Sequence, residues 1–216
     1  MQKNIILAAF AAAAMLATMG AARAEANLLI NGNFEAPTTS ELGPNSYVQT
    51  DTLNGWTLTY GSKFETMSGV VGQPYEGKQF VELASTTTSG IQQTVDTVAG
   101  KTYVLGYAFS ARPGTSFQEN DLGIFVNNLM VQEKHAVGSS DSNSNWKYFT
   151  YAFTATGDKT TIGFGDLNPN SSSSLGTYID ATHLAAVPEP SSVAAFMIGG
   201  LALGALALRR RKSVAA

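Results

Sequence analysis

Apolar and polar side chains alternate over two long stretches of this 216-residue chain. Residues 101–110 place an aromatic or leucine side chain at every second position, and residues 145–155 repeat the pattern with Phe149, Tyr151 and Phe153. A period of two predicts β-strands with one buried face. We also expect strands at 28–30, 56–60, 79–83, 90–95, 122–126, 129–132, 160–164 and 178–186.

Turn-forming residues separate these stretches, and no helical period is present between residues 27 and 186. Asn127 and Asn128 stand between two apolar runs, and asparagine tolerates the positive φ that a two-residue hairpin turn requires. Many short strands with frequent turns predict an all-β fold. We expect a two-sheet β-sandwich of the jelly-roll type over residues 25–186.

Residues 1–24 have the pattern of a secretory signal peptide. Lys3 precedes an apolar run at 5–19, and Ala22-Arg23-Ala24 provides a cleavage site of the A-x-A type. Ala26 is an alternative cleavage point, and an uncleaved N-terminal anchor is the alternative interpretation. Cleavage would require the secretory translocon and signal peptidase as partners.

The last thirty residues, 187–216, contain three parts in a fixed order. Pro188, Glu189 and Pro190 come first, and an apolar stretch that we expect to be helical at about 191–208 follows. The basic cluster comes last and consists of Arg209, Arg210, Arg211 and Lys212. Positive charge resists translocation, so this cluster should stay cytoplasmic while the preceding domain lies outside.

This order resembles the PEP-CTERM sorting signal of Gram-negative bacteria. The resemblance implies that Pro188, Glu189 and Pro190 form a recognition element for an exosortase, a membrane protease that processes the tail. It also implies an inner-membrane precursor that later reaches the cell surface or the exopolysaccharide matrix. The alternative is an ordinary C-terminal membrane anchor, in which the prolines only end a strand and precede a helix.

Charge is distributed unevenly along the chain. Residues 25–186 hold seven Lys and Arg against fifteen Asp and Glu, so the body is near −8 although the whole chain is −3. Such a body has no electrostatic footprint for nucleic acid. The chain contains no cysteine, which excludes thiol chemistry and cysteine-ligated metals.

Two short stretches bracket the predicted domain. Residues 27–35 contain Asn-Gly-Asn-Phe-Glu, and residues 177–184 contain Tyr-Ile-Asp. This pair resembles the galactose-binding-like jelly rolls found among carbohydrate-binding modules. The resemblance implies that the first and last strands lie together and that Glu35 and Asp180 hold a structural Ca²⁺. Ala181 stands where the family often has a second polar residue, and the alternative is that both carboxylates accept hydrogen bonds from loop amides.

The same resemblance implies a glycan-binding surface of aromatic rings. We name Trp56, Tyr60, Phe64 and Tyr75 as glycan-binding candidates. Trp56 could instead be a core tryptophan at the start of a strand.

Catalysis finds little support in the sequence. His135 and His183 are the only histidines, and they lack the spacing of a zinc site. We therefore expect an exported, non-catalytic protein of the exopolysaccharide or biofilm matrix that binds extracellular glycans. The alternatives are a structural or adhesive matrix protein without a glycan pocket and a glycan hydrolase.

Overall fold

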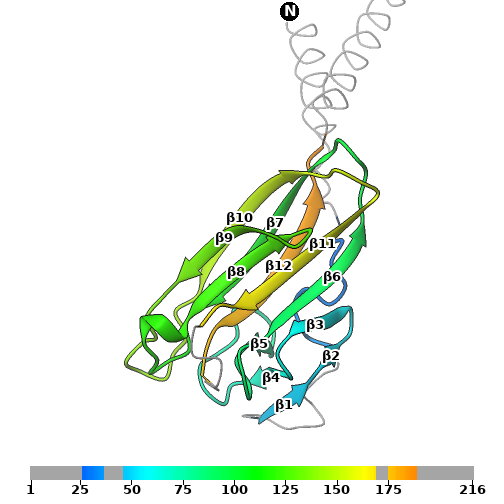
Figure 1. Ribbon diagram of the computed structural model, residues 1–216. Helices are drawn as coiled ribbons and strands as arrows, with labels where there is room; N and C mark the ends of the chain where they lie inside the picture. The colour runs from blue at the N-terminus through cyan, green and yellow to red at the C-terminus, as the bar shows by residue number, and fades with distance from the viewer. Residues whose placement is uncertain (1–25, 37–45, 169–174, 189–216) are drawn as a thin grey trace, which may run out of the picture.

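The computed structural model describes residues 26–36, 46–168 and 175–188 of the chain. This part of the chain forms two six-stranded antiparallel sheets stacked face to face (Figure 1). The all-β sandwich that the alternation predicted is confirmed. The signal peptide (1–24), Glu189, Pro190, the apolar stretch (191–208) and the basic cluster (209–212) lie outside the described residues. Within the described residues, no helix is long and apolar enough to cross a membrane.

The sheet that we call sheet A carries both bracketing stretches. Its strands, in spatial order, are β1 (Ser46–Thr50), β4 (Phe64–Ser68), β5 (Phe80–Glu82), β12 (Tyr178–Ala186), β7 (Thr102–Ser110) and β10 (Lys147–Thr154). Sheet B consists of β2 (Thr52–Leu53), β3 (Trp56–Tyr60), β6 (Gly90–Asp96), β11 (Lys159–Asp166), β8 (Asp121–Val126) and β9 (Leu129–His135). A 3₁₀ turn, η2 (Phe117–Glu119), precedes β8.

The main core lies between the two sheets. Tyr107 is fully buried there and contacts Phe164 edge to face, with ring centroids 5.5 Å apart. The alternate positions of β7, such as Gly106, face away from this core. Packing between the inner faces therefore decides which side chains turn outward on each sheet.

A second, smaller apolar cluster covers part of the outer face of sheet A. It consists of Met67, Phe80 and Tyr178, with Val71 and Trp146 packed against it. The hydroxyl of Tyr178 donates to the carbonyl of Val71 at 3.1 Å, and the indole of Trp146 donates to the carbonyl of Gln73 at 2.7 Å. These bonds fasten the loop after β4 onto the sheet, so one end of this outer face is buried under chain.

The hairpin at Asn127-Asn128 is confirmed. β8 ends at Val126 and β9 begins at Leu129, and Asn127 and Asn128 between them have φ values of 51° and 64°. Positive φ at both central residues is what a type I′ turn requires.

The strand expected at 28–30 is wrong. Residues 28–33 form turns, with Asn31 at a φ of 52°, because only Leu29 of the apolar run enters the core. The segment still lies along β12, as the resemblance to galactose-binding-like jelly rolls implied. The amide of Leu28 donates to the carbonyl of Leu184 at 2.8 Å, and the amide of Thr182 donates to the carbonyl of Gly32 at 2.7 Å.

Candidate ligand-binding surfaces

The loop at residues 75–79 is held by two carboxylates from opposite ends of the chain. Glu35 Oε1 accepts from the amides of Lys78 at 2.6 Å and Gln79 at 2.8 Å. Asp180 Oδ2 accepts from the amides of Tyr75 at 2.9 Å and Glu76 at 3.2 Å. The two predicted metal ligands are thus brought to one loop, where N–H donors already point at their oxygens.

A β-bulge directs Asp180 towards this loop. The pairing of β12 with β7 shifts register between Asp180 and His183, and Ala181 adopts a φ of 49°. Asp180 is fully buried, and burial raises its pKa to about 7 against the opposing hydrogen bonds from loop amides. The arrangement is that of the hydrogen-bonded alternative, and Ca²⁺ at Glu35 and Asp180 stays a prediction.

Gly77 permits the close approach of Glu35 to the loop. Its φ is +67°, and a Cβ at this position would meet the Glu35 carboxylate. Only glycine combines this backbone conformation with that proximity at no steric cost. The loop therefore holds Tyr75 and Glu76 in fixed positions on the outer face of sheet A.

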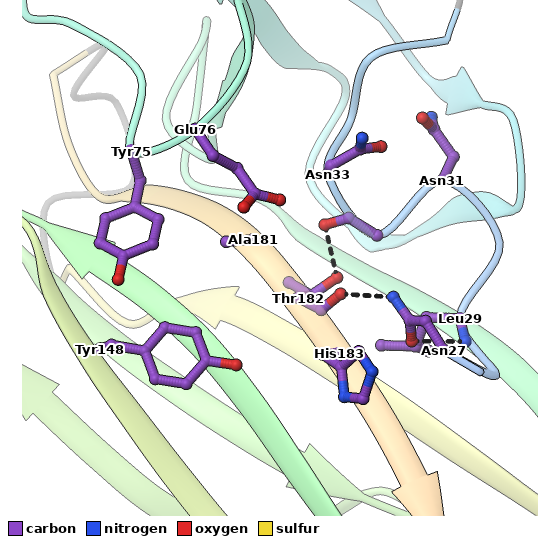
Figure 2. A pocket seen from close by; sticks show the side chains of 11 residues that line it. Asn27, Leu29, Asn31, Asn33, Tyr75, Glu76, Tyr148, Ala181, Thr182 and His183 are labelled. Carbon is purple, nitrogen blue, oxygen red and sulfur yellow. Dashed lines mark hydrogen bonds between the residues drawn. The ribbon is translucent and has the colours of Figure 1, made fainter. Parts of the chain in front are cut away.

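A cleft of about 560 Å³ opens beside this loop, between the N-terminal segment, β10 and β12 (Figure 2). We call it the sheet A cleft. It is lined by Asn27, Leu29, Asn31, Gly32, Asn33, Tyr75, Glu76, Tyr148, Ala181, Thr182 and His183. Its volume lies in the range of about 300–1,000 Å³ that is usual for small-molecule sites.

Two tyrosines form the aromatic side of the sheet A cleft. The rings of Tyr75 and Tyr148 stack with centroids 6.0 Å apart and an interplanar angle of 24°. Tyr148 lies over Gly106 of β7, where any side chain would collide with its hydroxyl. Burial, with Tyr75 and Glu76 adding to it, raises the pKa of Tyr148, so its hydroxyl stays neutral and can donate hydrogen bonds.

The outer face of sheet B has a floor of glycines. Gly90, Gly123, Gly163 and Gly165 lie on three adjacent strands, β6, β11 and β8. They alternate with core residues such as Phe164, so all four face outward. We call this patch the glycine floor.

Two aromatic rings lie on the glycine floor. A Cβ at Gly90 would be 2.5 Å from Tyr60 Cε1, and a Cβ at Gly165 would be 2.5 Å from the Tyr60 hydroxyl oxygen and 3.3 Å from Phe125 Cε2. The two rings therefore meet over Gly165. We call Tyr60 and Phe125 on the glycine floor the aromatic platform.

The platform is held in place and partly open to solvent. Tyr60 is 40% exposed, and its hydroxyl donates to the carbonyl of Asp166 at 2.8 Å. Burial raises the pKa of Tyr60, with a further rise from the nearby Asp166 and Asp121 carboxylates, so the phenol is uncharged. A register shift between Leu58 and Tyr60 turns this ring outward at the end of β3.

Polar groups flank the aromatic platform. On β8 and β9, the imidazole of His135 lies between two carboxylates, with Nδ1 3.3 Å from Asp121 Oδ1 and Nε2 3.2 Å from Glu133 Oε1. On the other side, Gln92 and Thr57 pair across β6 and β3. Asp121, Glu133 and His135 are also a group whose ligand atoms lie within 4.8 Å of one another, the geometry of a potential cation site among the described residues.

The four aromatic candidates from the sequence separate into three groups. Trp56 and Phe64 are 1% and 0% exposed, so their assignment to a glycan surface is wrong: both are core residues, and Trp56 packs on Phe34 and Phe164. Tyr60 lies on the platform and Tyr75 lines the cleft on the opposite sheet. Of the predicted sorting residues, Pro188 is the last residue that the structure describes.

Sequence reasoning missed Phe125 and Tyr148. Their signal was present in the glycines, because Gly163, Gly165 and Gly106 interrupt strands at positions where a ring from a neighbouring strand needs room. Glycine inside a strand often marks such a close approach.

A β-sandwich followed by a C-terminal sorting signal is the class that these features define. Residues 186–212 match the PEP-CTERM protein-sorting motif, which implies export and processing by an exosortase in a Gram-negative bacterium. Residues 27–185 match the model described as "Protein of unknown function (DUF642)", and the chain belongs to this family. No curated protein matches the chain.

Several solved structures with a similar arrangement are carbohydrate-binding modules. A "Family 16 Carbohydrate Binding Module-2" is 20% identical with a TM-score of 0.44, covering 74% of this chain and 99% of that one. A family 35 module from Clostridium thermocellum is 14% identical with a TM-score of 0.41, covering 66% and 99%. TmCBM61, solved with β-1,4-galactotriose, is 15% identical with a TM-score of 0.38, covering 75% and 99%. These similarities are too distant to assign a ligand.

Proposed function

We propose that this protein is a non-catalytic, surface-sorted module of the extracellular matrix that binds neutral polysaccharide chains across the outer face of sheet B. The aromatic platform carries the proposal. Tyr60 and Phe125 meet over Gly165, and four glycines at the floor leave room for rings in a place where ordinary side chains would stand. Aromatic surface with polar groups at its margin is the usual composition of a ligand site.

The flanking groups fit the hydroxyls of a sugar chain. The carboxylates of Asp121 and Glu133 can accept from sugar hydroxyls, and the amide of Gln92 can both donate and accept. The acidic body, near −8, disfavours polyanionic chains by charge repulsion. A neutral glycan is therefore the ligand class that this surface suits best.

The same carboxylates support a non-catalytic role. Asp121 and Glu133 both contact the one imidazole of His135, with ligand atoms within 4.8 Å. Glycosidases hold two carboxyl groups about 5–10 Å apart, on either side of the scissile bond. Here the two groups form one compact cluster on one side of the platform.

Affinity electrophoresis tests the proposal. The purified protein is run in gels that contain hydroxyethyl cellulose, xylan or galactomannan. We expect retardation by at least one of these polymers, and we expect Tyr60→Ala to weaken it at least about tenfold, which corresponds to about 1.4 kcal/mol. Tyr60→Phe keeps the ring and should keep most of the binding, and Tyr47→Ala removes another exposed tyrosine, on the edge strand β1 of sheet A, as a control.

Two results would contradict glycan binding at the platform. Unchanged mobility in all three polymers would favour the alternative of a structural or adhesive matrix protein. Equal weakening by Tyr60→Ala and Tyr47→Ala would show that binding does not depend on the platform.

The sorting role makes a separate prediction. Deletion of residues 188–190 should leave the protein as a membrane precursor, because the exosortase would lack its recognition element. Intact mass and cell fractionation measure this outcome. Normal processing and surface release of the deletion variant would refute the role of Pro188, Glu189 and Pro190.

A further inference from the structure

The sheet A cleft has the composition of a binding site of its own. Its aromatic side is the stacked pair Tyr75 and Tyr148, which are 44% and 46% exposed. Each of the two side chains is positioned by a feature of the backbone beside it. The carboxylate of Asp180 holds the amide of Tyr75, and Gly106 makes room for Tyr148.

The wall opposite the tyrosines is held by side-chain hydrogen bonds to the backbone. The side chain of Asn27 donates to the carbonyl of Thr182 at 2.8 Å and accepts from the amides of Leu29 and Leu184 at 3.0 and 2.9 Å. The side chain of Asn31 is bonded in both directions to the backbone of Ala36. These two amides build the wall and are not needed for a ligand.

Three polar side chains remain to meet a ligand. Asn33 and Glu76 are exposed, and His183 is half-buried on the outer face of β12. Figure 2 shows the tyrosine rings on one side of the cleft, Glu76 and Asn33 along its upper margin and His183 below them. Together they offer a carboxylate acceptor, an amide and an imidazole around an aromatic surface.

The charges of the cleft favour a neutral ligand over an anionic one. Glu76 is the only carboxylate among the eleven described residues that line the cleft, and none of them is Lys or Arg. A phosphate, sulfate or uronate would meet repulsion from Glu76 and would find no Lys or Arg among these residues. A neutral polyol with one apolar face, such as a sugar residue, can stack on the rings and donate hydroxyls to Glu76.

We infer that the sheet A cleft is a second carbohydrate site and that one molecule can bridge two polysaccharide chains. The cleft lies on the outer face of sheet A and the aromatic platform on the outer face of sheet B, with the core between them. Two sites that face away from each other cannot bind adjacent sugars of one short oligosaccharide. Bridging rests on the proposed function at the platform, whereas the cleft site shares with that function only the class of ligand, because the residues of the two sites are distinct.

Calorimetric titration of the exported protein with cellohexaose, xylohexaose and mannohexaose measures the number of sites. Over the hexasaccharides that it recognises, we expect the wild-type protein to show two binding sites per molecule. Tyr148→Ala should remove one site and leave the other, Tyr60→Ala should remove the opposite one, and the double variant should not bind. Glu76→Gln keeps the fold and the cleft shape, so it should weaken only the site that Tyr148→Ala removes.

A second readout tests bridging directly. Wild type mixed with a polysaccharide that it binds should raise viscosity or form a precipitate, whereas either single variant should bind without doing so. The inference would be overturned if Tyr148→Ala and Glu76→Gln both bound all three hexasaccharides as the wild-type protein does. If only Tyr60→Ala lost binding, the aromatic platform would be the single carbohydrate site. If only Tyr148→Ala lost binding, the sheet A cleft would be the single site and the proposed function at the platform would be wrong.

Discussion

The two outer faces of the sandwich differ in how much chain covers them. On sheet A, the loop around Gln73 and the N-terminal segment lie over the strands and enclose a cleft. On sheet B, glycines replace side chains and two rings lie directly on the strands. The comparison teaches that an aromatic surface can be held in two ways, by covering chain with buried polar anchors or by removing side chains beneath the rings.

The covering of sheet A should affect the free energy of unfolding most strongly through a buried ion pair. This gives the largest expected effect. Glu82 and Arg112 approach to 2.6 Å, with Glu82 completely buried, and burial raises the pKa of Glu82 while Arg112 opposes the rise. Arg112→Met strands the buried carboxylate, and we expect a loss of about 3–5 kcal/mol in the free energy of unfolding. Urea denaturation measures it.

The matched control for this pair is the double variant Glu82→Leu with Arg112→Met. Replacing a whole buried pair by apolar side chains is often nearly neutral, so the double variant should recover most of the loss. If Arg112→Met alone lost less free energy of unfolding than the double variant, this ion pair would not anchor the covered face.

The glycine floor makes the next prediction. Gly165→Val places a branched side chain where the rings of Tyr60 and Phe125 meet, and we expect a cost of about 1–3 kcal/mol from overpacking, together with loss of glycan binding. Gly100→Ala is the control for a glycine substitution, because nothing lies within 4 Å of a Cβ there, although its φ of +83° adds strain. Glycan binding retained by Gly165→Val would separate the floor from the site.

Buried acids should make stability depend on pH. Burial raises the pKa of Asp166, at the end of β11, to about 7. The folded state therefore binds a proton more tightly than the unfolded state, whose Asp pKa is about 3.9, and stability falls as pH rises between these two values. We expect Asp166→Asn to flatten this fall and to raise the thermal midpoint near pH 8 by a few degrees.

The pH prediction has a clear contrary result. A thermal midpoint for wild type that rises steadily from about pH 4 to pH 8 would show that Asp166 is ionised and well compensated in the folded state.

Calcium gives a smaller and conditional effect on the covered face. If Glu35 and Asp180 hold Ca²⁺, the ion stabilises the folded state by mass action, and Glu35→Ala should lower the thermal midpoint more with Ca²⁺ than with chelator. Equal lowering in both conditions would identify the hydrogen bonds to Lys78 and Gln79 as the whole role of Glu35.

The smallest effect is expected for the open face. Lys159 and Asp96 approach to 2.6 Å, as close as the buried pair, but they are 64% and 88% exposed. Asp96→Asn should therefore leave the thermal midpoint unchanged, since exposed pairs contribute little. If Asp96→Asn lost as much stability as Arg112→Met, the strength of an ion pair would not depend on whether chain covers it.

The strands with one buried face could be predicted from the sequence, and those at the covered end could not. β10 alternates in burial because one of its sides faces the core. In β7 the core-facing side carries the aromatic and leucine side chains, although the strand is buried on both sides from Leu105 to Ser110. In β4, Phe64 to Met67 are all buried, because the covering loop encloses the side that would otherwise be polar. Its sequence therefore has no period of two, and Phe64 could not be recognised as a core residue.

The candidate sites were only half visible in the sequence for a similar reason. Tyr60 and Tyr75 stand out as aromatic residues near turns, but which face they join depends on irregularities in pairing. A register shift turns Tyr60 outward, and the bulge after Asp180 aims this carboxylate at the loop of Tyr75. Such shifts follow from tertiary contacts that local patterns do not encode.

The most direct test of the central claim is an amide NMR titration of the exported protein with a neutral hexasaccharide that retards it in affinity gels. The account predicts shift changes at Gly90, Gly123, Gly163 and Gly165, beneath the rings of Tyr60 and Phe125, which a bound sugar would cover. Saturable binding with these four glycine amides unmoved would contradict it.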